Sequence, residues 1–147
     1  MPIRTITMAD LSLLEVLDKK CFSDAVRYNR FAFDYYLSIP NSIGLLKTKG
    51  NKLMGFIITA PLADDIFNIV TIDIDPEFRR KGIGSELILA VIRILKQWEI
   101  EKITLQVSID NVPAIQFYLK HGFEIVEELP RYYPDNDGYQ MEYVIRE

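Results

Sequence analysis

The chain has 147 residues, of which 49% are hydrophobic and 26% are charged, and its formal net charge is −4. This length predicts one domain over residues 1–147, with a core large enough to need neither disulfides nor a metal. The acidic balance argues against a nucleic-acid partner, and one cysteine with one histidine excludes the usual structural zinc sites. No apolar run approaches the ~20 residues of a membrane span. The first residues carry no signal sequence, so we expect a cytoplasmic protein without a membrane partner.

The first part of the chain predicts one strand followed by two helices. Residues 3–6 predict a short strand. Thr7, three residues before Asp10, is typical of a capping box, which predicts a helix from there to about Lys20. An aromatic-rich stretch at 30–37 predicts a second, shorter helix.

A hairpin and a further strand are expected next. Residues 42–48 and 53–60 flank the turn-forming residues 49–52, which predicts a hairpin. Residues 66–74 alternate in polarity and are rich in β-branched side chains, which is typical of a strand, and Pro76 ends it.

The rest of the chain predicts the longest helix, a strand, a short helix and two strands, over residues 83–98, 103–107, 111–121, 123–129 and 139–145. Asp110 or Asn111 is expected to cap the short helix, His121 to lie at its end, and Gly122 to stop it. The order β-α-α-β-β-β-α-β-α-β-β combines hairpins with crossover helices. It therefore predicts an α/β fold with a mixed sheet.

A basic, glycine-bearing turn joins the strand at 66–74 to the longest helix. The start of a helix presents unpaired N–H groups and the positive end of its dipole. Gly82 and Gly84 would let a ligand approach the backbone, and Arg79, Arg80 and Lys81 add positive charge. The segment predicts a pyrophosphate site, although a plain turn before a solvated helix would carry similar residues. It is neither a P-loop nor a complete dinucleotide motif.

Two motifs carry a resemblance to a known family. Arg79-x-x-Gly82-x-Gly84, preceded by Ile72-x-Ile74-x-Pro76, resembles the coenzyme A signature of the GNAT acetyltransferase superfamily. Residues 111–123 resemble its other signature, N-x-x-A-x-x-F/Y-Y-x-x-x-G-F. The resemblance implies a GNAT fold, with a mixed central sheet, a splayed strand pair and helices on both faces. It also implies acetyl-CoA as cofactor and no metal.

The resemblance also assigns residues to the cofactor. The strand backbone would pair with the pantetheine amides, and the turn would hold the pyrophosphate. The residues so implied are Ile72, Asp73, Ile74, Arg79, Arg80, Lys81, Gly82, Ile83, Gly84, Ser85, Asn111 and Tyr118. Tyr118 matches the family tyrosine near the thioester sulfur, where a phenol can protonate the leaving thiolate.

The C-terminal part narrows the resemblance to one branch of the superfamily. Residues 131–141 resemble the Y-Y-x-x-x-D-A/G-x-x-M segment of protein N-terminal α-amino acetyltransferases, including ribosomal-protein alanine and archaeal enzymes. The segment around residues 26–29 is similar to their substrate loop. This implies a protein or peptide N-terminus as partner and direct acetyl transfer to it. The acceptor-binding residues implied are Val26, Tyr28, Tyr132, Tyr133 and Tyr139.

The general base is where the sequence departs from these relatives. Gln106 stands where many relatives carry Glu, and Asn68 stands where relatives carry Glu, His or Tyr. An amide accepts no proton at neutral pH, so neither residue can act as the base. Either amide oxygen could instead hold a water. Asp73 is a fallback base, but strict strand alternation places it on the other face from Asn68. Cys21 is expected to pack rather than to react.

The missing base favours an α-amine as the acceptor. At pH 7 the neutral form costs ~1 kcal/mol for an α-amine and ~4.6 kcal/mol for a lysine. A small-molecule amine acetyltransferase, of the polyamine or antibiotic type, is the alternative enzyme. Because Gln106 and Asn68 are not bases, a non-catalytic acyl-CoA-binding module is a third interpretation. The oligomeric state is left open.

Overall fold

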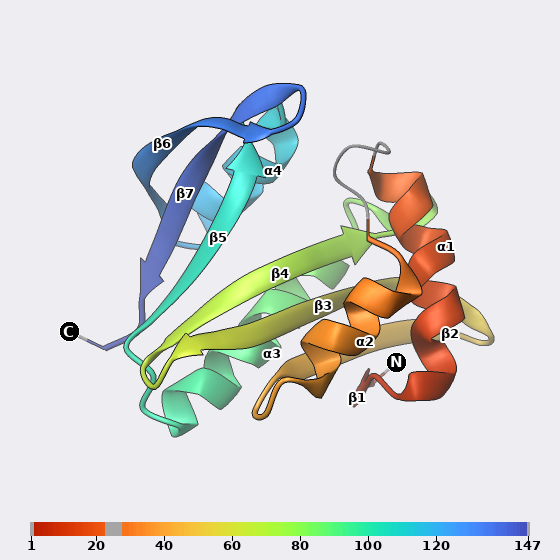
Figure 1. Cartoon of the computed structure of the whole chain (residues 1–147). Helices are drawn as coiled ribbons and strands as arrows, with labels where there is room; N and C mark the ends of the chain where they lie inside the picture. The colour runs from red at the N-terminus through yellow and green to blue at the C-terminus, as the bar shows by residue number, and fades with distance from the viewer. Residues whose placement is uncertain (1, 23–27, 147) are drawn as a thin grey trace.

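The computed structural model describes residues 2–22 and 28–146. Within them, seven strands form one mixed sheet in the order β1-β2-β3-β4-β5-β7-β6 (Figure 1). The strands are β1 (Ile3–Thr5), β2 (Ile43–Lys49), β3 (Lys52–Ala63), β4 (Ile66–Ile74), β5 (Lys102–Ser108), β6 (Glu124–Tyr133) and β7 (Asn136–Val144). All neighbouring pairs are antiparallel except β4 and β5.

Helices cover both faces of this sheet (Figure 1). They are α1 (Leu11–Cys21), α2 (Arg30–Ser38), α3 (Ile83–Gln97) and α4 (Val112–Lys120), with short 3₁₀ turns η1 (Met8–Asp10) and η2 (Pro76–Phe78). Helices α1 and α2 lie on one face, and α3 and α4 pack on the other. The predicted order of elements and the predicted α/β class are confirmed. No helix in the described part of the chain is long and apolar enough to cross a membrane.

Two apolar cores hold the layers together. Under α3, Leu87, Val91 and Leu95, spaced four residues apart, are completely buried. On the other face, Leu14 of α1 and Phe33 of α2 are completely buried against the sheet. Each such side chain contributes about 1.5–3 kcal/mol by leaving water. The sheet is therefore held from both sides, and its central strands keep a fixed position.

Strands β4 and β5 part after three residue pairs. Their parallel pairing runs only from Ile66 with Lys102 to Asn68 with Thr104. Beyond Asn68, β4 continues beside β3 while β5 continues beside β7. The predicted splayed strand pair is thus confirmed. One edge of β4 is left without a strand partner over its second half.

A β-bulge at Val70 accompanies the divergence. Thr71 pairs with Ile58 and Ile69 pairs with Thr59, which are neighbours on β3. Val70 is therefore an extra residue on β4 with no pairing partner on β3. A bulge bends and twists its strand locally. Strand β4 therefore changes course where it separates from β5.

The bulge also changes which face the following side chains occupy. Four β4 side chains pack in the core under α3, namely Phe67, Ile69, Ile72 and Ile74. Because neighbours in a strand alternate, Asn68 before the bulge and Asp73 after it both face α1 and α2. The expectation that Asp73 lies on the opposite face from Asn68 is therefore wrong, since strict alternation does not count the extra residue.

Candidate active site

The open edge of β4 presents backbone groups that β3 does not use. The N–H of Asp75 donates to the carbonyl of Met54 on β3, at 2.9 Å. Hydrogen-bonded and non-bonded pairs alternate along antiparallel strands, so Asp73 also directs its backbone to β3. By the same alternation, the N–H and C=O groups of Ile72 and Ile74 point to the edge that β5 has left. The carbonyl of Ile74 already accepts from Arg79 Nε and the Cys21 thiol, so both groups of Ile72 and the N–H of Ile74 are left for an extended ligand.

The start of α3 continues this edge. The first hydrogen bond within the helix runs from Glu86 N–H to the carbonyl of Gly82, at 3.0 Å, so the amides of residues 82–85 have no partner inside the helix. Gly82 has a φ of 80° and Arg80 a φ of 63°. These left-handed conformations turn the chain sharply into the helix. The result is a row of N–H donors without a partner in the helix, at the positive end of its dipole.

The basic residues of the turn are held by neighbouring groups. Arg79 donates from Nε to the carbonyl of Ile74, at 3.2 Å. The ammonium group of Lys81 lies 5.6 Å from the centre of the Phe78 ring, close enough for a cation–π contact. Both charges are thereby kept beside the helix start, where an anion would be stabilised.

The two glycines of the turn serve different purposes. A Cβ on Gly82 would meet no atom within 4 Å, so this glycine is needed for its φ and leaves open space. A Cβ on Gly84 would lie 3.2 Å from the Phe117 ring of α4. Gly84 therefore lets α4 pack closely against α3, which the sequence analysis did not foresee. Asn111 caps α4 by accepting from Ala114 N–H, at 3.3 Å.

Tyr118 of α4 is a buried phenol with an unused hydroxyl. Its residue is 7% exposed, and its ring packs between Phe117 and Phe123, with ring centres 5.5 and 5.7 Å away. The hydroxyl makes no hydrogen bond to any described residue. Burial raises the pKa of Tyr118. The phenol is therefore protonated at neutral pH and able to donate.

A network of amides lies where β4 and β5 part. Gln106 donates from Nε2 to Asn68 Oδ1, at 3.1 Å, and to Gln140 Oε1 on β7, at 2.8 Å. Thr104 also donates to Asn68 Oδ1, at 2.6 Å. The amide oxygen of Asn68 is thus already occupied, whereas Gln106 Oε1 accepts no hydrogen bond from a described donor. Of the two residues predicted to hold a water, Gln106 is the one with a free acceptor.

Aromatic residues from the segment ahead of α2 and from the end of β6 gather into one cluster. The Tyr132 and Tyr133 rings at the end of β6 are 4.9 Å apart. Tyr28, ahead of α2, contacts Tyr36 with ring centres 5.9 Å apart. Burial raises the pKa of Tyr28, and nearby Tyr36, Tyr132 and Tyr133 raise it further. Burial also raises the pKa of Tyr133 to about 12. The predicted acceptor residues Tyr28, Tyr132 and Tyr133 are thus brought together.

Two other predicted acceptor residues do not join them. Val26 lies outside the described residues. Tyr139 packs with Met141 on the core under α3 and α4, on the opposite face of β7 from Gln140. The resemblance of residues 131–141 assigned Tyr139 to the acceptor, but strand alternation turns its ring into the core.

The remaining candidates have structural roles. His121 donates from Nδ1 to the carbonyl of Phe117, at 2.8 Å, and so closes the end of α4 as expected. The Cys21 thiol donates to the carbonyl of Ile74, at 3.4 Å, and burial raises its pKa to about 11. A thiol in that state is a poor nucleophile.

Sequence reasoning missed a pair of buried acids between α1 and β4. Asp18 is completely buried and Asp73 is 1% exposed. The two share a side-chain hydrogen bond, and burial followed by Asp18 raises the pKa of Asp73 well above its usual range. One signal was available: Asp18 directly follows Leu17 and lies four residues after Leu14, on the apolar side of α1.

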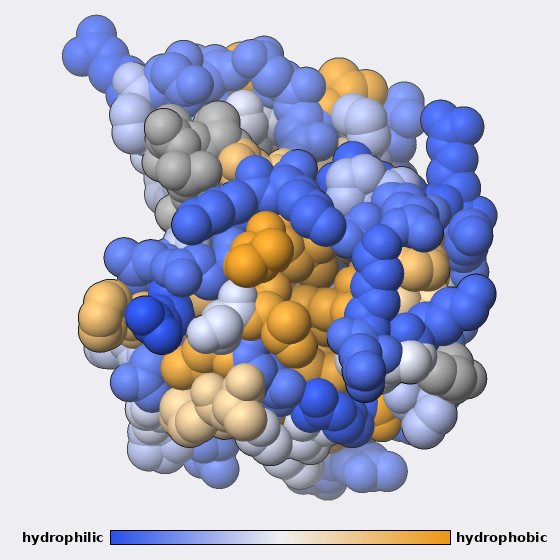
Figure 2. Space-filling model, turned by 90° about the vertical axis from the view of Figure 1, so that its right-hand side faces the viewer, coloured by the Kyte–Doolittle hydropathy of each residue, from blue (hydrophilic) through white to orange (hydrophobic). Residues whose placement is uncertain are grey.

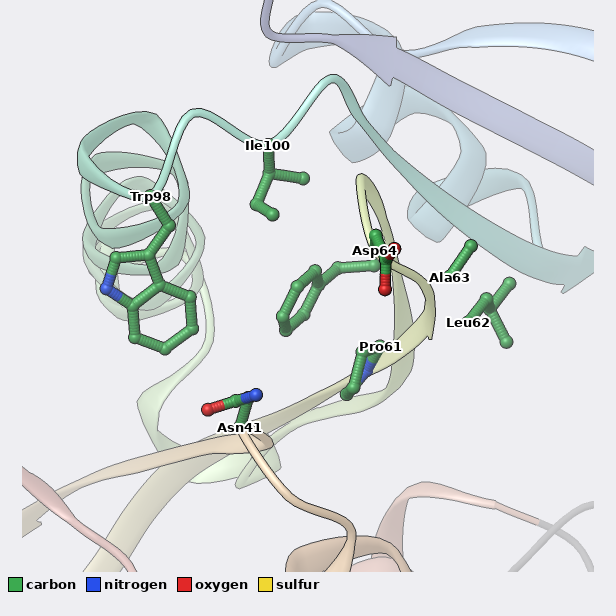
Figure 3. Close-up of a pocket in the computed structure, with 8 residues that line it drawn as sticks. Asn41, Pro61, Leu62, Ala63, Asp64, Trp98 and Ile100 are labelled. Carbon is green, nitrogen blue, oxygen red and sulfur yellow. The ribbon is translucent and has the colours of Figure 1, made fainter.

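Two hollows lie away from these groups. One of about 460 Å³ is near the β3–β4 turn and the end of α3 (Figure 3), lined by Asn41, Pro61, Leu62, Ala63, Asp64, Phe67, Trp98 and Ile100. Helix α3 lies between this hollow and the basic turn, and its 15 residues span about 22 Å at 1.5 Å per residue. The other lies beside α1, where Figure 2 shows apolar side chains bordered by hydrophilic ones, and Leu13, Val16 and Leu53 line it. The first hollow is remote from the site on β4, and the second touches only Asp75, directly after that strand.

Comparison with known proteins decides the family. Residues 11–123 match the acetyltransferase (GNAT) family, which is more than half of the chain. The chain belongs to this family. Across residues 2–22 and 28–146, the GNAT domain contains no group of three or more His, Cys, Asp or Glu side chains placed to hold a metal ion.

Individual relatives differ in what they are named for. The chain is 38% identical over 76 residues to an N-alpha-acetyltransferase of Sulfurisphaera tokodaii, covering 50% of this chain and 46% of that protein. It is 32% identical over 93 residues to the [ribosomal protein bS18]-alanine N-acetyltransferase of Escherichia coli K12, covering 62% and 61%. It is 41% identical over 118 residues to a mycothiol acetyltransferase of Saccharomonospora viridis, covering 75% and 36%. The chain thus spans between about a third and three fifths of these relatives.

Among solved structures, Ard1 from Thermoplasma volcanium superposes with a TM-score of 0.89 at 28% identity. The match covers 99% of this chain and 98% of that one. The GNAT fold is therefore matched over nearly the whole chain, β6 and β7 included.

Proposed function

We propose that this GNAT domain is an acetyl-CoA-dependent N-acetyltransferase that acetylates the N-terminal α-amine of a protein or peptide. The observation that carries the proposal is the open edge of β4, where the backbone groups of Ile72 and the N–H of Ile74 face away from β3. This edge leads directly to the unpartnered amides of residues 82–85. Pantetheine amides would pair with the edge as an added strand does, and a pyrophosphate would lie on the helix start. The residues present therefore fit acetyl-CoA.

The side chains of the site supply two proton-handling groups. Acetyl-CoA, when bound, supplies an acetyl thioester. The amine forms a C–N bond to its carbonyl carbon, and the C–S bond breaks. Tyr118 is protonated and donates to the departing thiolate. Gln106 Oε1 is free to accept a hydrogen bond from the amine, or from a water that carries its proton away.

The absence of a carboxylate from the network favours an α-amine as the acceptor. Gln106, Asn68 and Gln140 are all amides, so the amine must reach the site largely uncharged. At pH 7 this costs about 3.6 kcal/mol less for an α-amine than for a lysine. The cluster of Tyr28, Tyr132 and Tyr133 would contact the first residues of a peptide. The names of the Sulfurisphaera and Escherichia relatives agree with this substrate.

The test compares three acceptors at pH 7 with acetyl-CoA in excess. One is a lysine-free peptide with a free N-terminus, the second an N-blocked peptide with one lysine, and the third spermidine. We expect the free N-terminus to react at least about tenfold faster than the lysine peptide. Equal rates for the two peptides would refute the α-amine assignment.

The spermidine arm tests the second candidate, a small-molecule amine acetyltransferase. The mycothiol acetyltransferase relative favours this candidate, because its match is the longest of the three. Reaction with spermidine alone would replace the peptide assignment. No reaction with any acceptor, despite binding of acetyl-CoA, would support a non-catalytic acyl-CoA-binding module.

A further inference from the structure

A chain of hydrogen bonds links the centre of β4 to the acceptor side of the site. Thr71 donates from its hydroxyl to Asp73 Oδ1, at 2.5 Å. Asp73 shares a hydrogen bond with Asp18 near the end of α1. Asp18 Oδ2 in turn accepts from the backbone N–H of Tyr28, at 2.6 Å. The ring of Tyr28 packs on Phe33, with ring centres 5.8 Å apart.

The geometry requires a proton between the two carboxyls. Both side chains are buried, and two adjacent carboxylates that have lost their water cannot both be charged. Asp73 Oδ2 is buried and receives no hydrogen bond from an N–H or O–H donor of the described residues. Asp18 already accepts a backbone N–H, which favours its charged form. The proton therefore belongs on Asp73.

Other groups around Asp73 do not remove the need for a proton between the two carboxyls. Arg79 is the nearby cation, but it is exposed and donates to the Ile74 carbonyl, and its effect on Asp73 is smaller than those of burial and Asp18. Cys21 and Tyr118, on α1 and α4, are neutral near pH 7.

We propose that Asp73 is a positioning residue for the acceptor: its protonated carboxyl donates to Asp18, which holds the Tyr28 backbone and so places the Tyr28 ring beside Tyr132 and Tyr133. The role in acceptor binding rests on the proposed function. The hydrogen-bond chain itself does not, because it lies within the protein. The two parts therefore need separate measurements.

The test uses Asp73→Asn and Asp73→Leu. An asparagine can accept from Thr71 and donate to Asp18 without carrying a charge, whereas leucine has a similar size and no donor. We expect Asp73→Asn to keep the peptide KM within about twofold of wild type. Asp73→Leu should raise it about tenfold and leave the acetyl-CoA KM unchanged. Asp10→Leu is the matched control, because it removes a buried, ion-paired aspartate just before the other end of α1.

Hydrogen exchange of the Tyr28 amide tests the chain without any substrate. We expect it to be about tenfold faster in Asp73→Leu than in Asp10→Leu, and unchanged in Asp73→Asn. An Asn variant as impaired as the Leu variant would show that the charge of Asp73 is required, and would overturn the proposal. Unchanged Tyr28 exchange in a folded Asp73→Leu protein would do the same.

If Asp73→Leu does not fold, the wild-type protein still decides the question. Carbon-13 NMR of the Asp73 carboxyl at pH 7 should show the protonated form, and an ionised carboxyl would overturn the proposal. The remaining outcome is a protein that acetylates none of the acceptors although Asp73 is protonated and the Tyr28 amide is protected from exchange. That result would refute the proposed substrate and not the hydrogen-bond chain.

Discussion

Replacing Tyr118 by phenylalanine removes one hydroxyl from the site and little else. The ring stays between Phe117 and Phe123, and the hydroxyl has no hydrogen-bond partner among the described residues to leave behind. The free energy of unfolding should therefore change by no more than about 0.5 kcal/mol. Loss of a general acid lowers kcat by about 100-fold, equivalent to about 2.7 kcal/mol of transition-state stabilisation. The KM for acetyl-CoA should stay near wild type.

Steady-state kinetics and urea unfolding on the same preparation separate these effects. Tyr143→Phe is the matched control, since its ring also packs on Phe123, at 5.4 Å, but from β7. It should leave kcat unchanged. A Tyr118→Phe protein with wild-type kcat would reduce Tyr118 to a packing residue, and so would an equal loss of kcat in both variants.

Two further substitutions test the cofactor turn and the missing base. Gly82→Ala and Gly50→Ala both place a Cβ at positive φ with no atom within 4 Å, so each should destabilise the protein by about 1 kcal/mol. Only Gly82→Ala should weaken acetyl-CoA binding, by about tenfold in titration calorimetry, and equal affinities would move the pyrophosphate elsewhere. Gln106→Glu should speed acetylation of the lysine peptide and flatten the rise of the α-amine rate between pH 6 and 8, because a carboxylate takes over deprotonation. The Asn68 and Gln140 amides can rotate to donate to the new carboxylate. An unchanged pH–rate profile in the folded variant would place proton removal at another group.

Local patterns in the sequence were sufficient for the order of elements and for the cofactor turn. The spacing of apolar residues over 83–98 predicts α3 to within one residue, because one buried stripe is enough to specify a helix. Arg79 to Gly84 predicts an anion site, since glycines, basic residues and a helix start are all adjacent in the chain. The strand before the turn and the short helix after Asn111 follow from equally local signals.

Contacts between distant segments decided which way the site residues face. The extra residue at Val70 places Asp73 on the same face as Asn68, and no alternation rule reads a bulge from one strand. Tyr139 turns into the core because β7 pairs with β5 in a register that puts Gln140 beside Gln106. The Asp18–Asp73 pair exists only because α1 packs on β4, and its burial makes one of two ordinary carboxyls keep a proton. Residue types and spacing thus determine which chemistry is available, whereas sheet register and burial determine which groups meet and in what charge state.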